Sequence, residues 1–81
     1  MPDMTKVVGN RIKKKRVELG YTQEQLALLL GCSYQLIQHY ERGTAAMPIY
    51  TLQAFAHACW LPIDWFLVDE NEILVNIHLL N

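Results

Sequence analysis

Apolar residues recur along most of the chain at intervals of three and four, the spacing of a helix with one buried face, and strand-like alternation is almost absent. The first predicted helix covers residues 6–19. Its inward stripe is predicted to consist of Val8, Ile12, Arg16 and Leu19. Gly20 follows this stripe and is suited to a left-handed residue at the end of a helix.

Two further short helices are predicted from capping residues. Thr22 and Gln25 have the spacing of a capping box, in which each side chain binds a backbone amide at the start of the helix. This second helix should end at Gly31, with an inward stripe of Leu26, Ala27 and Leu30. Ser33 and Gly43 should bound the third helix, and its buried positions should be Ile37 and Tyr40.

The second half begins with a proline that fits the start of a fourth helix, Pro48. The core stripe of this helix should be Leu52, Phe55, Ala56 and Cys59. A fifth short helix is predicted from Pro62 to Leu67, burying Ile63 and Phe66. The chain is therefore expected to be all-α.

Only residues 31–33 separate the second and third predicted helices, which is the spacing of a helix-turn-helix. The stretch from Val8 to Leu67 resembles the lambda-repressor/Cro-like family of bacterial and phage regulators in four ordered motifs: "RIKKKRVELGYTQEQLA", "LGCS", "IQHYERG" and "LPIDWFL". The resemblance implies a compact five-helix DNA-binding domain, here 6–67, that binds a two-fold operator as a dimer. We expect a sequence-specific transcriptional repressor that reads double-stranded DNA as a homodimer.

Polar side chains on the free side of the third helix are the candidates for base contact. With Ile37 and Tyr40 turned inward, that side carries Tyr34, Gln35, Gln38 and His39. A glutamine amide can form two hydrogen bonds with adenine, and a tyrosine ring can touch a thymine methyl or donate to a phosphate. The resemblance assigns base contact to these positions, with Gln38 the least regular of them. The alternative is that polar residues merely coat an exposed helix.

Other residues are candidates for phosphate contact or for structure. Amides at the start of the second helix attract anions, which points to Thr22 and Gln23, and the resemblance supports Gln23. Further expected phosphate contacts are Arg42, Arg11, Lys13 and Lys15. Arg16 lies on an inward stripe and needs a partner there. The resemblance implies that this partner is Glu41.

Charge is divided unevenly along the chain. Its net charge is -1, but residues 1–43 carry seven basic and four acidic side chains, and residues 44–81 carry four acids and no Lys or Arg. The basic run around residues 11–16 is either a solvated helix face or a phosphate-binding patch. The loop "GTAAMP" lacks the basic residues that many relatives carry there, which predicts modest DNA affinity or a contribution from the first helix.

The extension at residues 68–81 is predicted to take part in dimerisation. Its sequence "ILVNIHLL" fits either a helix or a short strand, and both expose an apolar stripe that includes Ile73 and Ile77. Trp60 and Trp65 could complete the dimer surface, or they could pack internally. The tail could likewise cover the core of its own domain.

Several functions are excluded on the expected arrangement of residues. The three histidines fall on separate elements, no catalytic Ser or Cys motif is present, and Cys32 and Cys59 lack metal-ligand spacing, so neither an enzyme nor a metal or cofactor site is expected. The sequence contains no membrane span or signal peptide, and we expect a cytoplasmic protein with reduced thiols and no small-molecule effector. The alternative function is an antitoxin-type or adaptor module that binds a protein partner, with DNA binding secondary.

Overall fold

A computed structural model describes residues 3–70 of the chain. It contains α1 (Met4–Glu18), α2 (Gln23–Leu30), α3 (Tyr34–Arg42), α4 (Ile49–Ala58) and the 3-10 helix η1 (Ile63–Leu67). No strand occurs among these residues. The all-α prediction is therefore confirmed, but the expected five-helix count is corrected to four α-helices and one short 3-10 helix.

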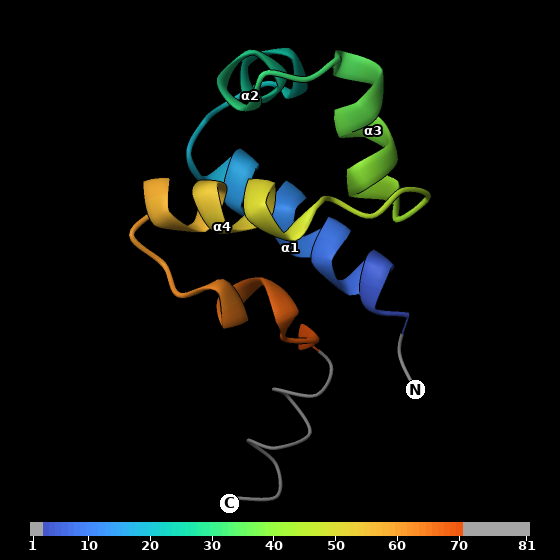
Figure 1. Cartoon of the computed structure of the whole chain (residues 1–81), viewed down its shortest axis with the longest axis vertical. Coiled ribbons are helices and arrows are strands. Elements are labelled where there is room, and N and C mark those ends of the chain that lie inside the picture. Colours follow the sequence, from blue (N-terminus) through green and yellow to red (C-terminus); the bar gives the residue numbers. More distant parts are fainter. Residues whose placement is uncertain (1–2, 71–81) are drawn as a thin grey trace, which may run out of the picture.

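The helices are arranged around α1, which packs against both α3 and η1. Figure 1 shows α2 and α3 on one side of α1, with clearly different directions, and η1 on the other side. The core that joins them is made of buried side chains from every element, with Ile12, Leu26, Ile37 and Phe66 the most completely enclosed. The orientation of α3 is thus determined by contacts with both α1 and α2.

The residues that begin and end α2 and α3 are those predicted from the sequence. The Thr22 hydroxyl accepts a hydrogen bond from Gln25 N at 3.1 Å, while the Gln25 side chain accepts one from Thr22 N at 2.9 Å. Ser33 caps α3 through Leu36 N at 3.1 Å. Gly31 and Gly43 end the two helices in the left-handed conformation, with φ of 68° and 76°. The short connection of a helix-turn-helix is therefore present.

The buried face of α1 differs from the prediction. Leu19 is 46% exposed, and the buried residues are Val7, Gly9, Arg11 and Ile12. Gly9 lies where α1 meets the backbone of α3, so closely that a Cβ at this position would collide with the carbonyl oxygen of Tyr40. Ile12 of the predicted stripe is buried, and Val8 and Arg16 are half-buried, so only Leu19 is wrong. The buried face is wider than predicted because α1 packs against both α3 and η1.

The predicted stripes of the other helices are close to those observed. Ile37 and Tyr40 are buried in α3, and three members of the α4 stripe are buried, with Cys59 half-buried. Phe66 is buried in η1 and Ile63 is half-buried against the core. The predicted stripe of the tail, with Ile73 and Ile77, lies outside the described residues.

Candidate nucleic-acid interface

The exposed face of α3 carries the polar side chains that the sequence singled out. Tyr34, Gln35 and His39 are exposed and Gln38 is half-buried, while Ile37 and Tyr40 face the core. Gln35 has no hydrogen-bond partner within residues 3–70, so both ends of its amide are available to another molecule. The exposed face is rich in hydrogen-bonding groups, and the buried Ile37 and Tyr40 on the opposite side of α3 fix the orientation of the helix.

Tyr34 and Gln38 are joined on this face by a hydrogen bond between positions one helical turn apart. Gln38 Nε2 donates to the Tyr34 hydroxyl oxygen at 2.9 Å. The phenolic proton of Tyr34 therefore remains free to be donated elsewhere. Gln38, predicted as a base contact, has part of its amide occupied in orienting Tyr34.

His39 is joined to the turn that follows α3. Its Nδ1 lies 2.8 Å from Thr44 Oγ1, and the same hydroxyl donates to the His39 carbonyl oxygen at 3.2 Å. Thr44 was not singled out from the sequence, because a loop threonine gives no signal of its own. The contact orients the His39 ring, with Nε2 on the side of the ring away from Thr44.

Glu41 is the centre of a buried polar network beneath α3. Arg16 binds it with two hydrogen bonds, Nε to Oε2 at 2.7 Å and Nη2 to Oε1 at 3.0 Å. The two side chains are only 11% and 3% exposed. Arg16 Nη1 also donates to the carbonyl oxygen of Tyr21 at 2.8 Å, in the connection between α1 and α2. The pair implied by the resemblance is thus in direct contact and links α1, α3 and the start of the helix-turn-helix.

Gln23 belongs to the same network. Its Nε2 donates to Glu41 Oε1 at 3.0 Å, which joins the first residue of α2 to α3. One amide proton of Gln23 is used in this bond, and the other proton is left for the predicted phosphate contact. At the N-terminus of α2 the capping box already uses the backbone amides of Thr22 and Gln25, which leaves those of Gln23 and Glu24 for an anion.

Arg11 is not a free phosphate contact, which corrects the prediction. The residue is 6% exposed, its Nε donates to the Trp65 carbonyl oxygen at 2.9 Å, and its guanidinium lies 3.7 Å from the centroid of the Trp65 ring. Its Nη1 also pairs with Glu70 at 3.3 Å. Arg11 therefore attaches α1 to η1 and to the segment after it.

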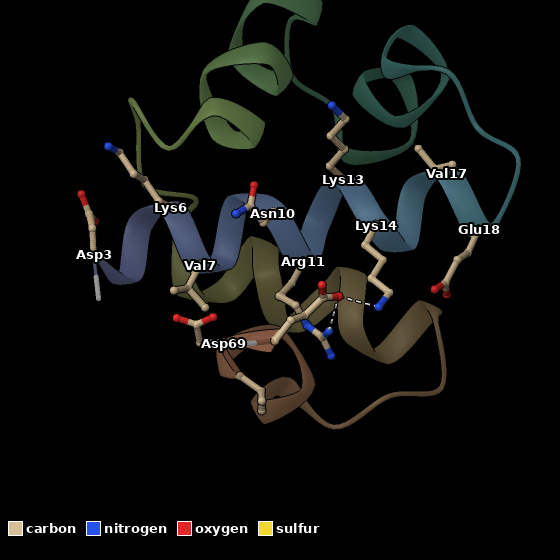
Figure 2. Close-up of a pocket in the computed structure, with 12 residues that line it drawn as sticks. Asp3, Lys6, Val7, Asn10, Arg11, Lys13, Lys14, Val17, Glu18 and Asp69 are labelled. Carbon is tan, nitrogen blue, oxygen red and sulfur yellow. Dashed lines mark hydrogen bonds and ion pairs between the residues drawn. The ribbon is translucent and has the colours of Figure 1, made fainter. Parts of the chain in front are cut away.

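The other basic residues of α1 differ in availability, and Figure 2 shows how they lie around an open hollow of about 630 Å³. Lys6 and Lys13 point to the side on which α2 and α3 lie, whereas Lys14 points the other way and pairs with Glu70. Lys15 pairs with Glu18 and lies 4.8 Å from the Trp65 ring centroid. Of the predicted phosphate contacts on α1, Lys13 is therefore the free one within the described part of the chain.

The end of α3 brings together two further cations. Arg42 is exposed and pairs with no carboxylate between residues 3 and 70. Lys6 passes so close to Gly43 that a Cβ there would lie 2.5 Å from its Cγ and 2.8 Å from its Cα. Lys6 was not among the predicted phosphate contacts, although it lies beside the neutral loop that lacks cations of its own.

Burial and ion pairing shift the pKa of several groups. Hydrogen bonding to Lys14 lowers the pKa of Glu70, and hydrogen bonding to Lys15 lowers the pKa of Glu18, so both carboxylates are charged at neutral pH. Burial raises the pKa of the Cys32 and Cys59 thiols. Neither cysteine is therefore activated as a nucleophile.

The two tryptophans occupy different environments. Trp65 is half-buried and packs on Phe66 with ring centroids 4.9 Å apart, in addition to its contacts with Arg11. Of the two predicted alternatives for Trp65, these contacts favour internal packing. Trp60 is 95% exposed and has a φ of 59°, which is rare for a residue with a side chain.

The described part of the chain contains neither a membrane-spanning helix nor a cluster of metal ligands. No helix in residues 3–70 is long and apolar enough to cross a membrane. Within the same range, no group of three or more His, Cys, Asp or Glu side chains is placed to hold a metal ion.

Comparison with known proteins agrees with this geometry. A family described as helix-turn-helix matches residues 12–66, so the chain belongs to the Cro/C1-type helix-turn-helix family, a family of DNA-binding transcriptional regulators rather than enzymes. A relative from Rhodospirillum rubrum, named "Uncharacterized transcriptional regulator in ATPase CF(0) region", is 42% identical over 62 residues, which are 76% of this chain and 57% of that protein.

Two other relatives are named as HTH-type transcriptional regulators. One from Sinorhizobium medicae is 39% identical over 62 residues, covering 76% of this chain and 45% of the relative. One from Sinorhizobium fredii is 38% identical over 56 residues, covering 69% of this chain and 73% of the relative. The chain thus spans about half the length of the first two relatives.

Proposed function

We propose that this protein represses transcription by placing α3 in the major groove of a specific DNA operator. The observation that carries the proposal is the face of α3, where Gln35 and His39 are exposed opposite the buried Ile37 and Tyr40, and Tyr34 is exposed at the side of this face. A helix of this width fits the major groove, which displays a different pattern of donors and acceptors for each base pair. Gln35 supplies both a donor and an acceptor, as bidentate contact with adenine requires.

Positioning on the DNA backbone is assigned to groups around this face. The exposed amides at the start of α2 suit one phosphate, and Arg42, Lys13 and Lys6 suit others. The backbone and the first side-chain carbons of Lys6 lie against Gly43, so its ammonium group is within one side-chain length of the neutral loop. These contacts are independent of base sequence and weaken with added salt.

Replacing Gln35 with alanine tests base reading directly. We expect roughly tenfold weaker binding to the operator, because a bidentate contact contributes about 1 to 3 kcal/mol of discrimination, and unchanged binding to unrelated DNA. Fluorescence anisotropy with duplexes from upstream of the gene, at two salt concentrations, measures both. Gln53→Ala is the matched control, since Gln53 is an exposed glutamine on α4. Equal loss on both duplexes, or no loss on either, would contradict base reading by α3.

The proposal includes a homodimer in which Trp60 contributes to the contact between subunits. An exposed indole held at positive φ combines a large apolar surface with a strained backbone, and both are costs that an isolated domain would not need. Symmetric dimers are the commonest assemblies and fit operators with two half-sites about one helical turn apart.

Replacing Trp60 with asparagine tests this contact without harming the fold. Asparagine tolerates the left-handed conformation, so the stability of the monomer should be unchanged or increased. Loss of a large aromatic from an interface should raise the dimer dissociation constant at least about tenfold. Sedimentation velocity over a series of protein concentrations measures the dimer dissociation constant. If the variant and the natural protein dimerise with the same dissociation constant, Trp60 is not part of the interface. If the natural protein is monomeric at every concentration, the proposed homodimer is wrong.

A further inference from the structure

The turn after α3 folds back onto the last turn of the helix at His39. Thr44 N and Ala45 N donate to the His39 carbonyl oxygen at 3.0 and 3.3 Å. The positive φ of Gly43, 76°, makes this reversal possible. As a result, the Thr44 hydroxyl lies next to the His39 imidazole, although Thr44 is itself exposed.

The Thr44 hydroxyl makes two contacts but has one proton to donate. Its oxygen lies 2.8 Å from His39 Nδ1 and 3.2 Å from the His39 carbonyl oxygen. If Nδ1 carries a proton, it donates to Oγ1 while the hydroxyl donates to the carbonyl, and both contacts are hydrogen bonds. If Nδ1 is unprotonated, the hydroxyl can donate either to Nδ1 or to the His39 carbonyl oxygen, but not to both. With Nδ1 protonated, both contacts of the hydroxyl are hydrogen bonds at the same time, and two hydrogen bonds in series strengthen one another.

The position of His39 in α3 favours the same arrangement. His39 lies in the last turn of the helix, where carbonyl groups without helical partners make the end electrically negative. A ring N–H directed toward that end is favoured over a ring lone pair.

From these contacts we propose that Thr44 holds neutral His39 in the tautomer with the proton on Nδ1, so that Nε2 accepts a hydrogen bond from the amino group of adenine or cytosine. The proposal rests on the proposed function, because it requires α3 to lie in the major groove. Thr44 is then a positioning residue, and His39 is a contact with defined polarity.

The polarity of Nε2 decides which bases His39 can recognise. In the major groove adenine and cytosine present an amino donor, whereas guanine and thymine present only acceptors at their hydrogen-bonding positions. An Nε2 that accepts a hydrogen bond can pair with the amino group of adenine or cytosine. At guanine or thymine it would face another acceptor, and no hydrogen bond could form. Gln35, whose amide both donates and accepts, does not impose this choice by itself.

The tautomer can be measured on the free protein by ¹⁵N NMR of the imidazole at a pH where the ring is neutral. The expected spectrum shows a protonated Nδ1 and a bare Nε2 for His39. Thr44→Val removes the hydroxyl at an exposed position and should abolish this preference, and Thr44→Ser should restore it. A protonated Nε2 in the natural protein, or an unchanged tautomer in Thr44→Val, would overturn the proposal without any reference to DNA.

Base preference is measured separately with duplexes selected from a random pool by the natural protein. The base pair opposite His39 is located with His39→Ala, and then adenine and cytosine are compared with guanine and thymine at that position. Thr44→Val should reduce the preference for adenine or cytosine roughly tenfold, the size of one good base contact, with Thr44→Ser close to the natural protein.

Gln35→Ala separates the two hypotheses in the same assay. If Gln35→Ala lowers operator affinity while Thr44→Val leaves the base preference unchanged, base reading by α3 stands and the role of Thr44 is overturned. If the pool yields no preferred duplex, the proposed function fails, and the NMR result still decides whether Thr44 fixes the tautomer.

Discussion

Replacing Arg16 with methionine is expected to lower the free energy of unfolding by about 3 to 5 kcal/mol, the usual cost of removing one partner from a buried ion pair. The Glu41 side chain would remain at 3% exposure with only the Gln23 amide to bind its carboxyl group. Methionine retains the length and apolar stem of arginine, so most of the loss comes from the unpaired carboxylate. Urea denaturation followed by circular dichroism measures the difference.

Two further variants test whether burial of the ion pair causes the loss of stability in Arg16→Met. Lys14→Met breaks an ion pair of similar chemistry in which the lysine is 46% exposed, and it should cost no more than about 1 kcal/mol. Changing Arg16 and Glu41 together to methionine and leucine should recover most of the stability, because paired apolar residues of similar size often replace a buried ion pair without loss. A loss in Arg16→Met as small as that in Lys14→Met would refute the assigned role.

The Glu41 network matters for function because of the elements that it joins. Arg16 comes from α1, Gln23 begins α2 and Glu41 lies near the end of α3. The carboxylate therefore holds both helices of the helix-turn-helix against α1. On the proposed function, breaking it should disturb the placement of Gln35 and His39 even in molecules that remain folded.

Local chemistry made parts of this fold predictable. The caps at Thr22 and Ser33 and the left-handed glycines Gly31 and Gly43 each depend on residues within a few positions, so sequence spacing is enough to recognise them. The inner face of α3 was likewise predictable because Ile37 and Tyr40 are its obvious apolar pair. The exposed polar face then follows from helical geometry.

The face of α1 was harder to predict because its burial depends on distant segments. Four consecutive basic residues weaken the apolar pattern of this helix, so helical periodicity alone favoured a stripe ending at Leu19. In the structure, Arg11 is buried because the ring and the carbonyl of Trp65, 54 positions further along, cover it. Nothing adjacent to Arg11 in sequence indicates that contact.

The polar contacts on the exposed face of α3 show the same limit. Gln38 and Tyr34 are four positions apart, and such a pair can be anticipated on a helix. The contact between His39 and Thr44 depends on the path of the chain after Gly43. Residue types give the candidates for base contact, but the conformation of this turn determines how one of them is oriented.

The helix-internal glycine of α1 leads to the second large effect: Gly9→Ala is expected to destabilise the protein by about 3 kcal/mol. Alanine normally stabilises a helix by about 1 kcal/mol over glycine, so the sign is reversed here. The reason is that a Cβ at Gly9 would collide with the Tyr40 carbonyl oxygen and also lie 3.1 Å from the Glu41 carbonyl oxygen. Both obstacles are backbone, so α1 and α3 would have to move apart and open the core between them.

Asn10→Ala is the matched control for this effect, since Asn10 is the next residue of the same helix and is exposed. It should raise stability slightly, because alanine is the better helix former, and the two neighbouring substitutions should therefore change stability in opposite directions. Thermal and urea denaturation of both variants measure this contrast. Equal and favourable effects would mean that α1 and α3 are not in backbone contact at Gly9, whereas the expected contrast would explain why a helix of this domain contains glycine at a cost to its own propensity.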